Sequence, residues 1–152
     1  MNAENNKVAL VTGGAKRIGS AIIKKLHTSG YNTIIHYRNS KESAEALATE
    51  LNALRANSAV CISADLNKTD AIQQLAENAL TAWGHIDALV NSASCFYPTP
   101  VGNTTESQWD ELISSNMKAP FFLSQALAPA LKKQQGAIVN IADIYAEKPL
   151  AT

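Results

Sequence analysis

Short apolar segments alternate with longer amphipathic ones along the whole chain. The apolar segments, rich in β-branched residues, are 7–12, 32–37, 58–63, 87–92 and 137–142. Nearly continuous apolarity is typical of parallel strands that are covered on both faces. The segments with apolar residues at helical spacing are 18–29, 41–56, 69–83 and 106–133. Strands separated by helices imply right-handed crossovers, so the pattern predicts an α/β fold with a parallel sheet.

The fourth helical segment and the loop before it interrupt this regular alternation. Pro120 and Pro129 fall within 106–133. Proline removes a backbone donor and crowds the preceding turn, so we expect two helices or a kinked one, with the break near 117–120. The preceding stretch, 94–107, is the longest irregular segment of the chain. Long ordered loops after a strand are frequent places for functional sites.

The order of the segments also predicts the architecture. A doubly wound nucleotide-binding sheet has six strands in its usual form. This chain has five predicted strands and ends ten residues after the last of them. We therefore predict a Rossmann-type doubly wound parallel sheet that is truncated after the fifth strand, in one domain spanning 1–152.

Composition excludes several functional classes. Thirteen basic residues balance thirteen acidic ones, which argues against a nucleic acid or an anionic membrane as partner. Cys61 and Cys95 lack metal-ligand or CxxC spacing and are interpreted as free thiols of a reducing compartment. The polar segment 1–7 is not a secretory signal, and no apolar run is long enough to span a membrane. We expect a cytoplasmic protein without a metal site.

A glycine turn between the first strand and the first helix suggests phosphate binding. Gly13 and Gly14 follow the strand, and Gly19 lies in the helix that comes next. A strand, a glycine turn and a helix together direct backbone N–H groups and the helix dipole at a phosphate. Ser20 follows where a P-loop needs lysine, so an NTPase is disfavoured. The alternative is a glycine-rich corner without a ligand.

The end of the second strand indicates which dinucleotide is bound. NAD-binding folds place an Asp or Glu there for the ribose hydroxyls. The segment 36–40 reads HYRNS, and the first acid after it is Glu42. An arginine with amide and hydroxyl donors suits a 2′-phosphate, so the sequence favours NADP over NAD. An exposed arginine at a strand end is the simpler alternative.

Seven motifs together carry a resemblance to a known family. They are TGGAKRIG (12–19), HYRNS (36–40), the pair Asp65 and Leu66, NSAS (91–94), FYPTP (96–100), SNMKAP (115–120) and IVNIADIYAEKPL (138–150). The sequence resembles the short-chain dehydrogenase/reductase superfamily and, within it, the pteridine reductases. Arg17 stands where most members have glycine, which is typical of that branch.

The resemblance implies a cofactor, a substrate class and a set of binding residues. The cofactor would be NADPH, held by Gly13, Lys16, Arg17, Ile18, Gly19, His36, Tyr37, Arg38, Asn39, Ser40, Asp65, Leu66, Asn91, Ala93 and Ser94. The substrate would be a pterin or folate, stacked between the nicotinamide and Phe96. Arg17 and Ser94 would bind its polar edge. Without the resemblance, the favoured interpretation of Phe96 is a loop aromatic that packs in the core or is exposed by chance.

Catalytic groups follow from the same resemblance. Asp143 ends the fifth strand where most short-chain reductases have serine, and an acid suits a substrate whose ring nitrogens gain protons. A simple strand terminus is the alternative for Asp143. Asn116 corresponds to the structural and catalytic asparagine of the superfamily. The family's Tyr-x-x-x-Lys pair would lie beyond Thr152, so we expect this chain to be an N-terminal part, inactive alone, of a homotetramer.

The predicted function is NADPH-dependent reduction of a pterin, a dihydropteridine or dihydrofolate. Two alternatives stay open at this point. One is a carbonyl or 3-oxoacyl reductase of the same superfamily, which Asp143 in place of serine disfavours. The other is a dinucleotide-binding module that performs no chemistry.

Overall fold

Five parallel strands form a single sheet at the centre of the molecule. The computed structural model describes residues 6–143. The strands, in the spatial order β3-β2-β1-β4-β5, are β1 (Val8–Val11), β2 (Asn32–Tyr37), β3 (Ala59–Ser63), β4 (Ala88–Asn91) and β5 (Ala137–Asn140). All four strand pairs are parallel. The predicted strands and the Rossmann-type topology are therefore confirmed, because this order is the doubly wound one.

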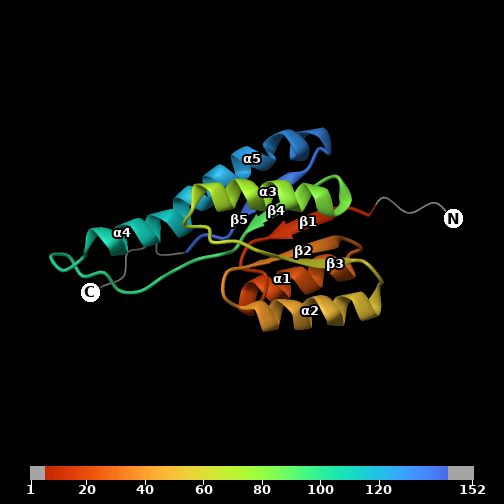
Figure 1. The fold of residues 1–152 in the computed structure, drawn as a ribbon, viewed down its shortest axis with the longest axis horizontal. Coiled ribbons are helices and arrows are strands. Elements are labelled where there is room, and N and C mark those ends of the chain that lie inside the picture. The colour runs from red at the N-terminus through yellow and green to blue at the C-terminus, as the bar shows by residue number, and fades with distance from the viewer. Residues whose placement is uncertain (1–5, 144–152) are drawn as a thin grey trace.

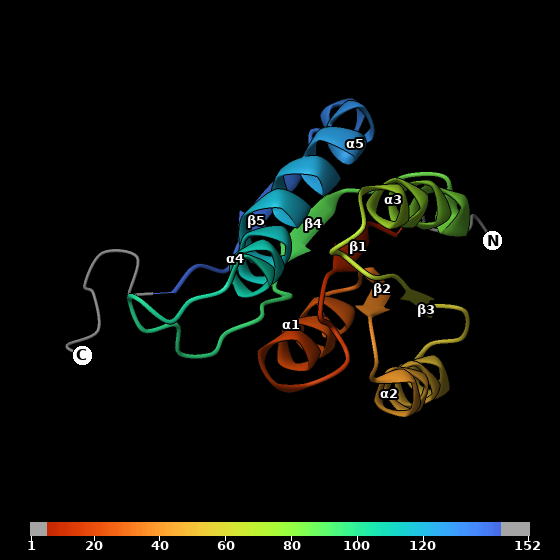
Figure 2. The ribbon, with the colours of Figure 1, turned by 60° about the vertical axis from the view of Figure 1, so that its left-hand side comes forward.

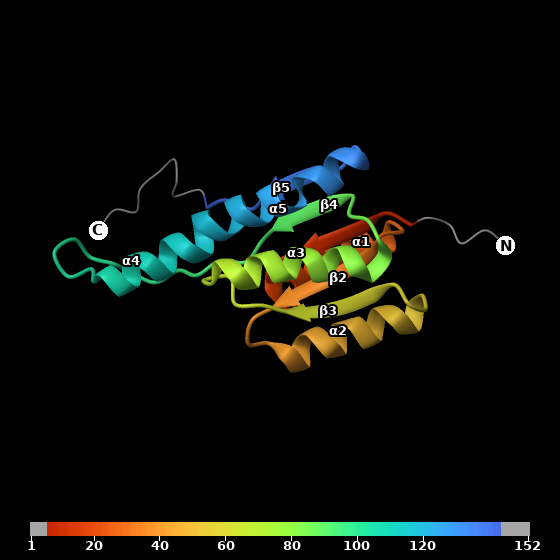
Figure 3. The same cartoon turned by 45° about the horizontal axis from the view of Figure 1, so that its top comes forward.

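Helices cover both faces of the sheet. One face carries α1 (Arg17–Thr28) and α2 (Lys41–Leu54), and the other carries α3 (Thr69–Trp83) and α5 (Ala119–Lys133), as Figure 2 shows. The short helix α4 (Glu106–Ile113) projects past the carboxyl ends of the strands (Figures 1 and 3). The site is therefore built at that end, where the strand-to-helix loops gather.

Alternating strand residues separate the core into two clusters, one on each face. Leu10 of β1 and Leu89 of β4 pack with residues of α3 and α5. Val11 and Val90, which follow them directly in the same strands, pack with residues of α1 and α2. Successive side chains of a strand point to opposite faces, so continuous apolar strands supply both clusters at once.

The predicted break in the long helical segment is a π-helical turn. The segment η1 (Ser114–Lys118) joins α4 to α5, and Pro120 stands in the first turn of α5. Pro129 lies inside α5, which continues to Lys133. Proline cannot donate a hydrogen bond to the preceding turn, and the wider π turn ends two residues before Pro120. Such turns are frequent at functional sites, and this one borders the cleft described below.

Strand β5 lies at the edge of the described sheet and is open to solvent. Ile138 and Val139 of β5 are 41% and 47% exposed, and Ile141, just after the strand, is 46% exposed. Apolar side chains on both faces of an exposed edge strand favour association with another chain or segment.

Candidate functional site

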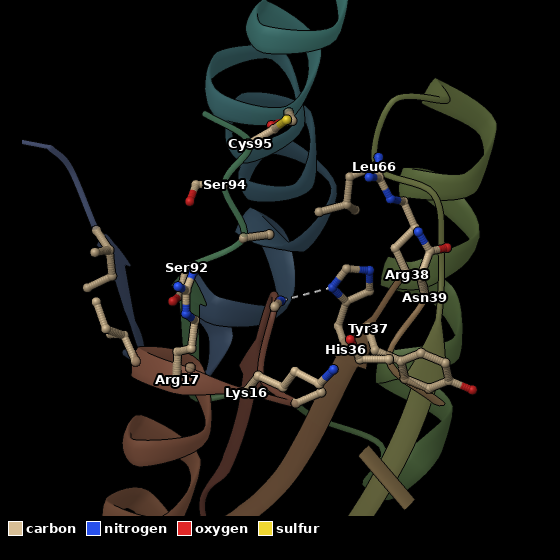
Figure 4. Close-up of a pocket in the computed structure, with 18 of the residues that line it drawn as sticks. Lys16, Arg17, His36, Tyr37, Arg38, Asn39, Leu66, Ser92, Ser94 and Cys95 are labelled. Carbon is tan, nitrogen blue, oxygen red and sulfur yellow. Dashed lines mark hydrogen bonds between the residues drawn. The ribbon is translucent and has the colours of Figure 1, made fainter. Parts of the chain in front are cut away.

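A cleft of about 420 Å³ opens at the carboxyl ends of the strands (Figure 4). It lies where the strand order reverses, between β1 and β4, which is the usual ligand position in such sheets. The predicted cofactor residues that line it are Gly13, Lys16, Arg17, Ile18, Gly19, His36, Tyr37, Arg38, Asn39, Ser40, Leu66, Ala93 and Ser94. Sequence reasoning missed further lining residues, namely Ala15, Asn67, Ser92, Cys95, Ser115 and Ile141.

The glycines of the turn are required by close backbone approaches. A Cβ on Gly13, whose φ is +62°, would lie 2.9 Å from Ala93 Cα. A Cβ on Gly19 would lie 2.1 Å from the carbonyl oxygen of Gly13. The turn therefore packs directly on the start of α1 and on the end of β4. This closeness leaves the first N–H groups of α1 at the cleft, where a phosphate can bind them.

The start of α1 is open to an anion. No side chain of the described residues caps this helix, and its first turn has no acid. Lys16 and Arg17 both line the cleft, and Figure 4 shows them extending in different directions. The Lys16 side chain points toward Tyr37, whereas the Arg17 side chain rises beside Ser92. The two cationic side chains thus lie in opposite halves of the cleft.

Arg17 has a backbone conformation that ordinarily favours glycine. Its φ is +51°, in the left-handed region. A residue with a side chain is disfavoured there by about 1 kcal/mol or more, and such strain is concentrated at functional sites. The arginine therefore occupies this position at a cost in stability, which indicates that its side chain has a function.

Replacing Arg17 by glycine is expected to stabilise the fold and to weaken the site. Relief of the left-handed strain should raise the free energy of unfolding by about 1 kcal/mol. The guanidinium beside Ser92 is lost in the same variant. Urea unfolding measures the first effect and ligand titration the second. Unchanged or lower stability of the variant would contradict the strain at this position.

Two buried side chains hold the turn to the neighbouring strands. The Thr12 hydroxyl accepts hydrogen bonds from the N–H groups of Ser92 and Ala93, both at 3.0 Å. On the other side, the N–H of Gly13 donates to His36 Nδ1 at 3.1 Å. The second ring nitrogen of His36 lies 3.1 Å from the carbonyl oxygen of Ala64. The turn is therefore fixed to β4 through Thr12 and to β2 through His36.

The residues after β2 and β3 form the basic end of the cleft. Arg38 Nη1 lies 4.0 Å from Asp65 Oδ1, and both side chains are partly exposed. Asp65 Oδ1 also accepts a hydrogen bond from the N–H of Asn67 at 3.2 Å, and Asp65 does not line the cleft. A partly exposed pair at this distance is weak, so Arg38 is available to an anionic ligand. Asn67 Oδ1 is buried without a hydrogen-bond partner among the described residues.

The loop after β4 is fastened to the π turn. The Asn116 amide donates to the Cys95 carbonyl at 2.8 Å, and its oxygen accepts from the Cys95 N–H at 3.1 Å. Tyr97 donates its hydroxyl proton to Glu111 at 2.8 Å. Desolvation and this hydrogen bond raise the pKa of Tyr97 to about 12. Phe96, between these two anchors, is 69% exposed and stands outside the cleft lining.

Asn91 and Asp143 occupy different positions relative to the cleft. The Asn91 amide donates to Asn140 Oδ1 at 2.8 Å and to the Ser124 hydroxyl at 3.4 Å, and Asn91 does not line the cleft. The Asn91 side chain therefore links the ends of β4 and β5. Asp143 is exposed and does not end β5 as predicted, because the strand ends at Asn140, three residues earlier. The rest of the predicted motif, 144–150, lies outside the described residues.

Two further findings bear on the class of the site. Within residues 6–143, no helix is long and apolar enough to cross a membrane. The same part of the chain holds no group of three His, Cys, Asp or Glu residues arranged to bind a metal ion. The glycine cradle, the uncapped helix and the local cations instead fit a phosphate-bearing ligand.

The fold and the cleft define a dinucleotide-binding domain of the Rossmann type. Comparison with known proteins then assigns its family. The sequence profile described as short chain dehydrogenase matches residues 7–152. The chain belongs to this family, whose members are oxidoreductases.

Individual relatives agree with the family but differ in their substrates. The chain is 38% identical to pteridine reductase 1 of Leishmania tarentolae, over 94% of the chain and 63% of that protein. It is 34% identical to the 3-oxoacyl-[acyl-carrier-protein] reductase FabG of Staphylococcus epidermidis, over 91% of the chain and 57% of that protein. The chain therefore spans about three fifths of the length of these curated relatives.

Solved structures show the same fold. A blue fluorescent protein from a metagenomic library, crystallised in complex with NADPH, superimposes with a TM-score of 0.89 at 35% identity. That alignment covers 93% of this chain and 57% of the other. A short-chain dehydrogenase/reductase of Serratia marcescens has a TM-score of 0.89 at 30% identity, over 95% of this chain and 58% of the other.

Stability is expected to decrease as the pH falls from about 6.5 toward 4. Burial lowers the pKa of His36 from 6.5 to about 4. Below pH 6.5 the unfolded imidazole binds a proton while the folded one stays neutral, so protons favour unfolding. The stabilisation is complete above the unfolded pKa and decreases by up to about 3 kcal/mol toward pH 4, at roughly 1.4 kcal/mol per pH unit.

Urea unfolding between about pH 4.5 and 7.5 measures this slope. Burial and then the Arg55 charge lower the pKa of His27, which acts in the same direction. The variant His36→Gln, which does not titrate at this position, should lose the His36 part of the slope and keep the His27 part. An equal slope in the variant and the unsubstituted protein would contradict the assignment of the effect to His36.

Proposed function

We propose that the whole protein reduces a pterin, a dihydropteridine or dihydrofolate with NADPH. The observation that carries this proposal is the conformation of Arg17, a long cation retained at φ +51° beside Ser92 in the cleft. A turn that bound only a pyrophosphate would be served equally well by glycine at this position. The identity to pteridine reductase 1 over 94% of the chain supports the same substrate class.

The binding of NADPH follows from the two halves of the cleft. The turn from Gly13 to Gly19 and the start of α1 bind the pyrophosphate through backbone N–H groups. Lys16 and Arg38, with Asn39 and Ser40, bind the 2′-phosphate, since the end of β2 has no acid. Leu66, Ala93 and Ser94 line the rest of the cofactor site. The bound NADPH supplies a hydride from its nicotinamide C4.

The protein's own residues orient the substrate and deliver protons. Phe96 offers an exposed ring face for stacking on the flat pterin, and the Asn116 contacts with Cys95 fix the loop that carries it. Arg17 and Ser94 hydrogen-bond the polar edge of the ring. Asp143 passes a proton to the ring nitrogen next to the carbon that accepts the hydride. Tyr37 and Lys41 have Tyr-x-x-x-Lys spacing, but they stand at the end of β2 and the start of α2, at the end of the cleft proposed for the 2′-phosphate, so we give them no catalytic role. Turnover is proposed for the whole protein only.

Turnover of chosen substrates tests the proposal. NADPH oxidation by the full-length protein is measured with dihydrobiopterin, dihydrofolate and a 3-oxoacyl thioester. We expect turnover of a pterin-containing substrate and a much lower rate with the thioester. The 34% identity to FabG makes the thioester the competing candidate, so turnover of the thioester alone would replace our proposal. NADPH binding without turnover of any of the three would favour a non-catalytic module.

A substitution in the loop after β4 separates stacking from general folding effects. Phe96→Ala should raise the KM for the pterin by about tenfold, since base-like stacking on an aromatic ring contributes about 1–3 kcal/mol. The Kd for NADPH should not change. Val101→Ala is the matched control, because Val101 is fully exposed in the same loop. Equal KM values in both variants would contradict stacking on Phe96.

The proposal also covers the oligomeric state and the cellular location of the protein. Trp109, Met117 and Phe121 are 61–64% exposed along the helix formed by α4, η1 and α5, and exposed apolar patches mark interaction surfaces. We assign this surface to the interface of a homo-oligomer, which is a tetramer by family resemblance. A monomeric mass in light scattering would contradict it.

Cys61 and Cys95 are free thiols, which supports a cytoplasmic location, and cell fractionation tests it.

A further inference from the structure

His36 lies between the glycine turn and the end of β3 and is only 2% exposed. By sequence it belongs to the loop expected to bind the 2′-phosphate. In the structure both of its ring nitrogens lie within hydrogen-bond distance of backbone groups. Nδ1 accepts from the Gly13 N–H at 3.1 Å, the bond drawn in Figure 4, and Nε2 lies 3.1 Å from the Ala64 carbonyl oxygen.

These partners define the protonation state of the ring. Gly13 offers a hydrogen, so Nδ1 must carry a lone pair, whereas the Ala64 carbonyl requires a proton on Nε2. The ring is therefore neutral, in the Nε2–H form, and it has no N–H left for an anion. Burial, which lowers the pKa of His36 to about 4, is consistent with the same state.

The backbone of His36 strengthens the connection to the turn. Its carbonyl oxygen accepts the N–H of Gly14 at 2.9 Å. Two successive N–H groups of the turn are thus bound by a single residue of β2. Gly13 stands on the opposite side against Ala93, so closely that a Cβ added to Gly13 would lie 2.9 Å from Ala93 Cα. A turn held on both sides keeps its remaining N–H groups in one arrangement, which anion binding by backbone requires.

We propose that His36 is a positioning residue that fixes the pyrophosphate turn and is not a ligand of the 2′-phosphate. The inference rests on the proposed binding of NADPH. Under this proposal the segment 36–40 has two functions. His36 fixes the turn, whereas Arg38 binds the 2′-phosphate at the other end of the cleft.

Binding of three nucleotides to the full-length protein tests this division. The variant His36→Phe should raise the Kd for NADPH and for NADH by the same factor, about tenfold, because both carry the pyrophosphate. It should leave the affinity for 2′-AMP unchanged, since 2′-AMP has only the 2′-phosphate. His36→Gln should recover most of the loss, because its amide oxygen can accept from the Gly13 N–H and its NH₂ group can donate to the Ala64 carbonyl. Circular dichroism confirms that each variant is folded.

The outcomes distinguish this inference from the proposed function. A loss of affinity for NADPH and 2′-AMP, with NADH binding unchanged, would make His36 a phosphate ligand and overturn the inference. Unchanged binding of all three nucleotides in His36→Phe would overturn it as well. If the unsubstituted protein binds neither dinucleotide, the proposed function fails. Nitrogen NMR of His36 then decides the inference alone: an Nε2–H ring that shifts the Gly13 amide supports it, and an Nδ1–H ring overturns it.

Discussion

Replacing Gly19 by alanine is expected to disrupt the glycine turn and to abolish NADPH binding. The new Cβ would lie 2.1 Å from the Gly13 carbonyl oxygen and 2.8 Å from its carbon, both backbone atoms. Gly13 cannot retreat, because it already packs against Ala93. We expect the free energy of unfolding to fall by about 3 kcal/mol, the upper part of the range for overpacking. Urea unfolding and NADPH fluorescence titration measure the two effects.

Gly30→Ala is the matched control for this substitution. Gly30 has a φ of +91°, and a Cβ placed there would meet no atom within 4 Å. Its replacement should cost about 1 kcal/mol through backbone strain and leave the Kd for NADPH unchanged. NADPH affinity equal to that of the unsubstituted protein in Gly19→Ala would contradict the role given to the turn.

Replacing Arg38 by alanine is expected to weaken NADPH binding far more than NADH binding. Arg38 lines the cleft directly after β2, and its contact with Asp65 is long, at 4.0 Å. Hydrogen bonds to a charged group contribute about 1.5–3 kcal/mol, so the Kd for NADPH should rise roughly 30-fold. The Kd for NADH, which has no 2′-phosphate, should change less than about twofold. Fluorescence titration with both nucleotides gives the ratio.

Lys41→Ala controls for the loss of a positive charge near the cleft. Lys41 begins α2 and does not line the cleft, and its Nζ lies 3.8 Å from Glu45 Oε1. Its replacement should leave both nucleotide affinities nearly unchanged, since exposed charges are screened by salt. Equal losses of NADPH and NADH affinity in Arg38→Ala would show that Arg38 does not read the 2′-phosphate.

The sequence predicts the fold well because the spacing of apolar residues and the positions of glycine and proline are local properties of the chain. Each of the five strands is found within one or two residues of its expected bounds. Pro120 likewise indicates where the long helix is interrupted, although the interruption is a π turn and not a separation. Most of the expected cofactor residues line the cleft, since they follow strands whose carboxyl ends meet at one edge.

Three features of the site could not be predicted from the sequence pattern, and two of them are contacts between distant segments. The bond between Gly13 and His36 joins residues 23 positions apart. The pairing of Asn91 with Asn140 directs its side chain into the sheet. The left-handed conformation of Arg17 is a local backbone property that its residue type does not indicate. Spacing identifies these residues as important, whereas only the structure shows which of them bind and which position others.

Isotope transfer can show whether this cleft delivers a hydride from NADPH to a pterin, as we propose. The full-length protein is incubated with dihydrobiopterin and NADPH carrying deuterium on either face of C4, and the products are analysed by mass spectrometry. We expect reduced pterin that carries one deuterium on a ring carbon when one of the two faces is labelled. Reduced pterin without deuterium from either labelled cofactor, or no reduced pterin at all, would contradict it.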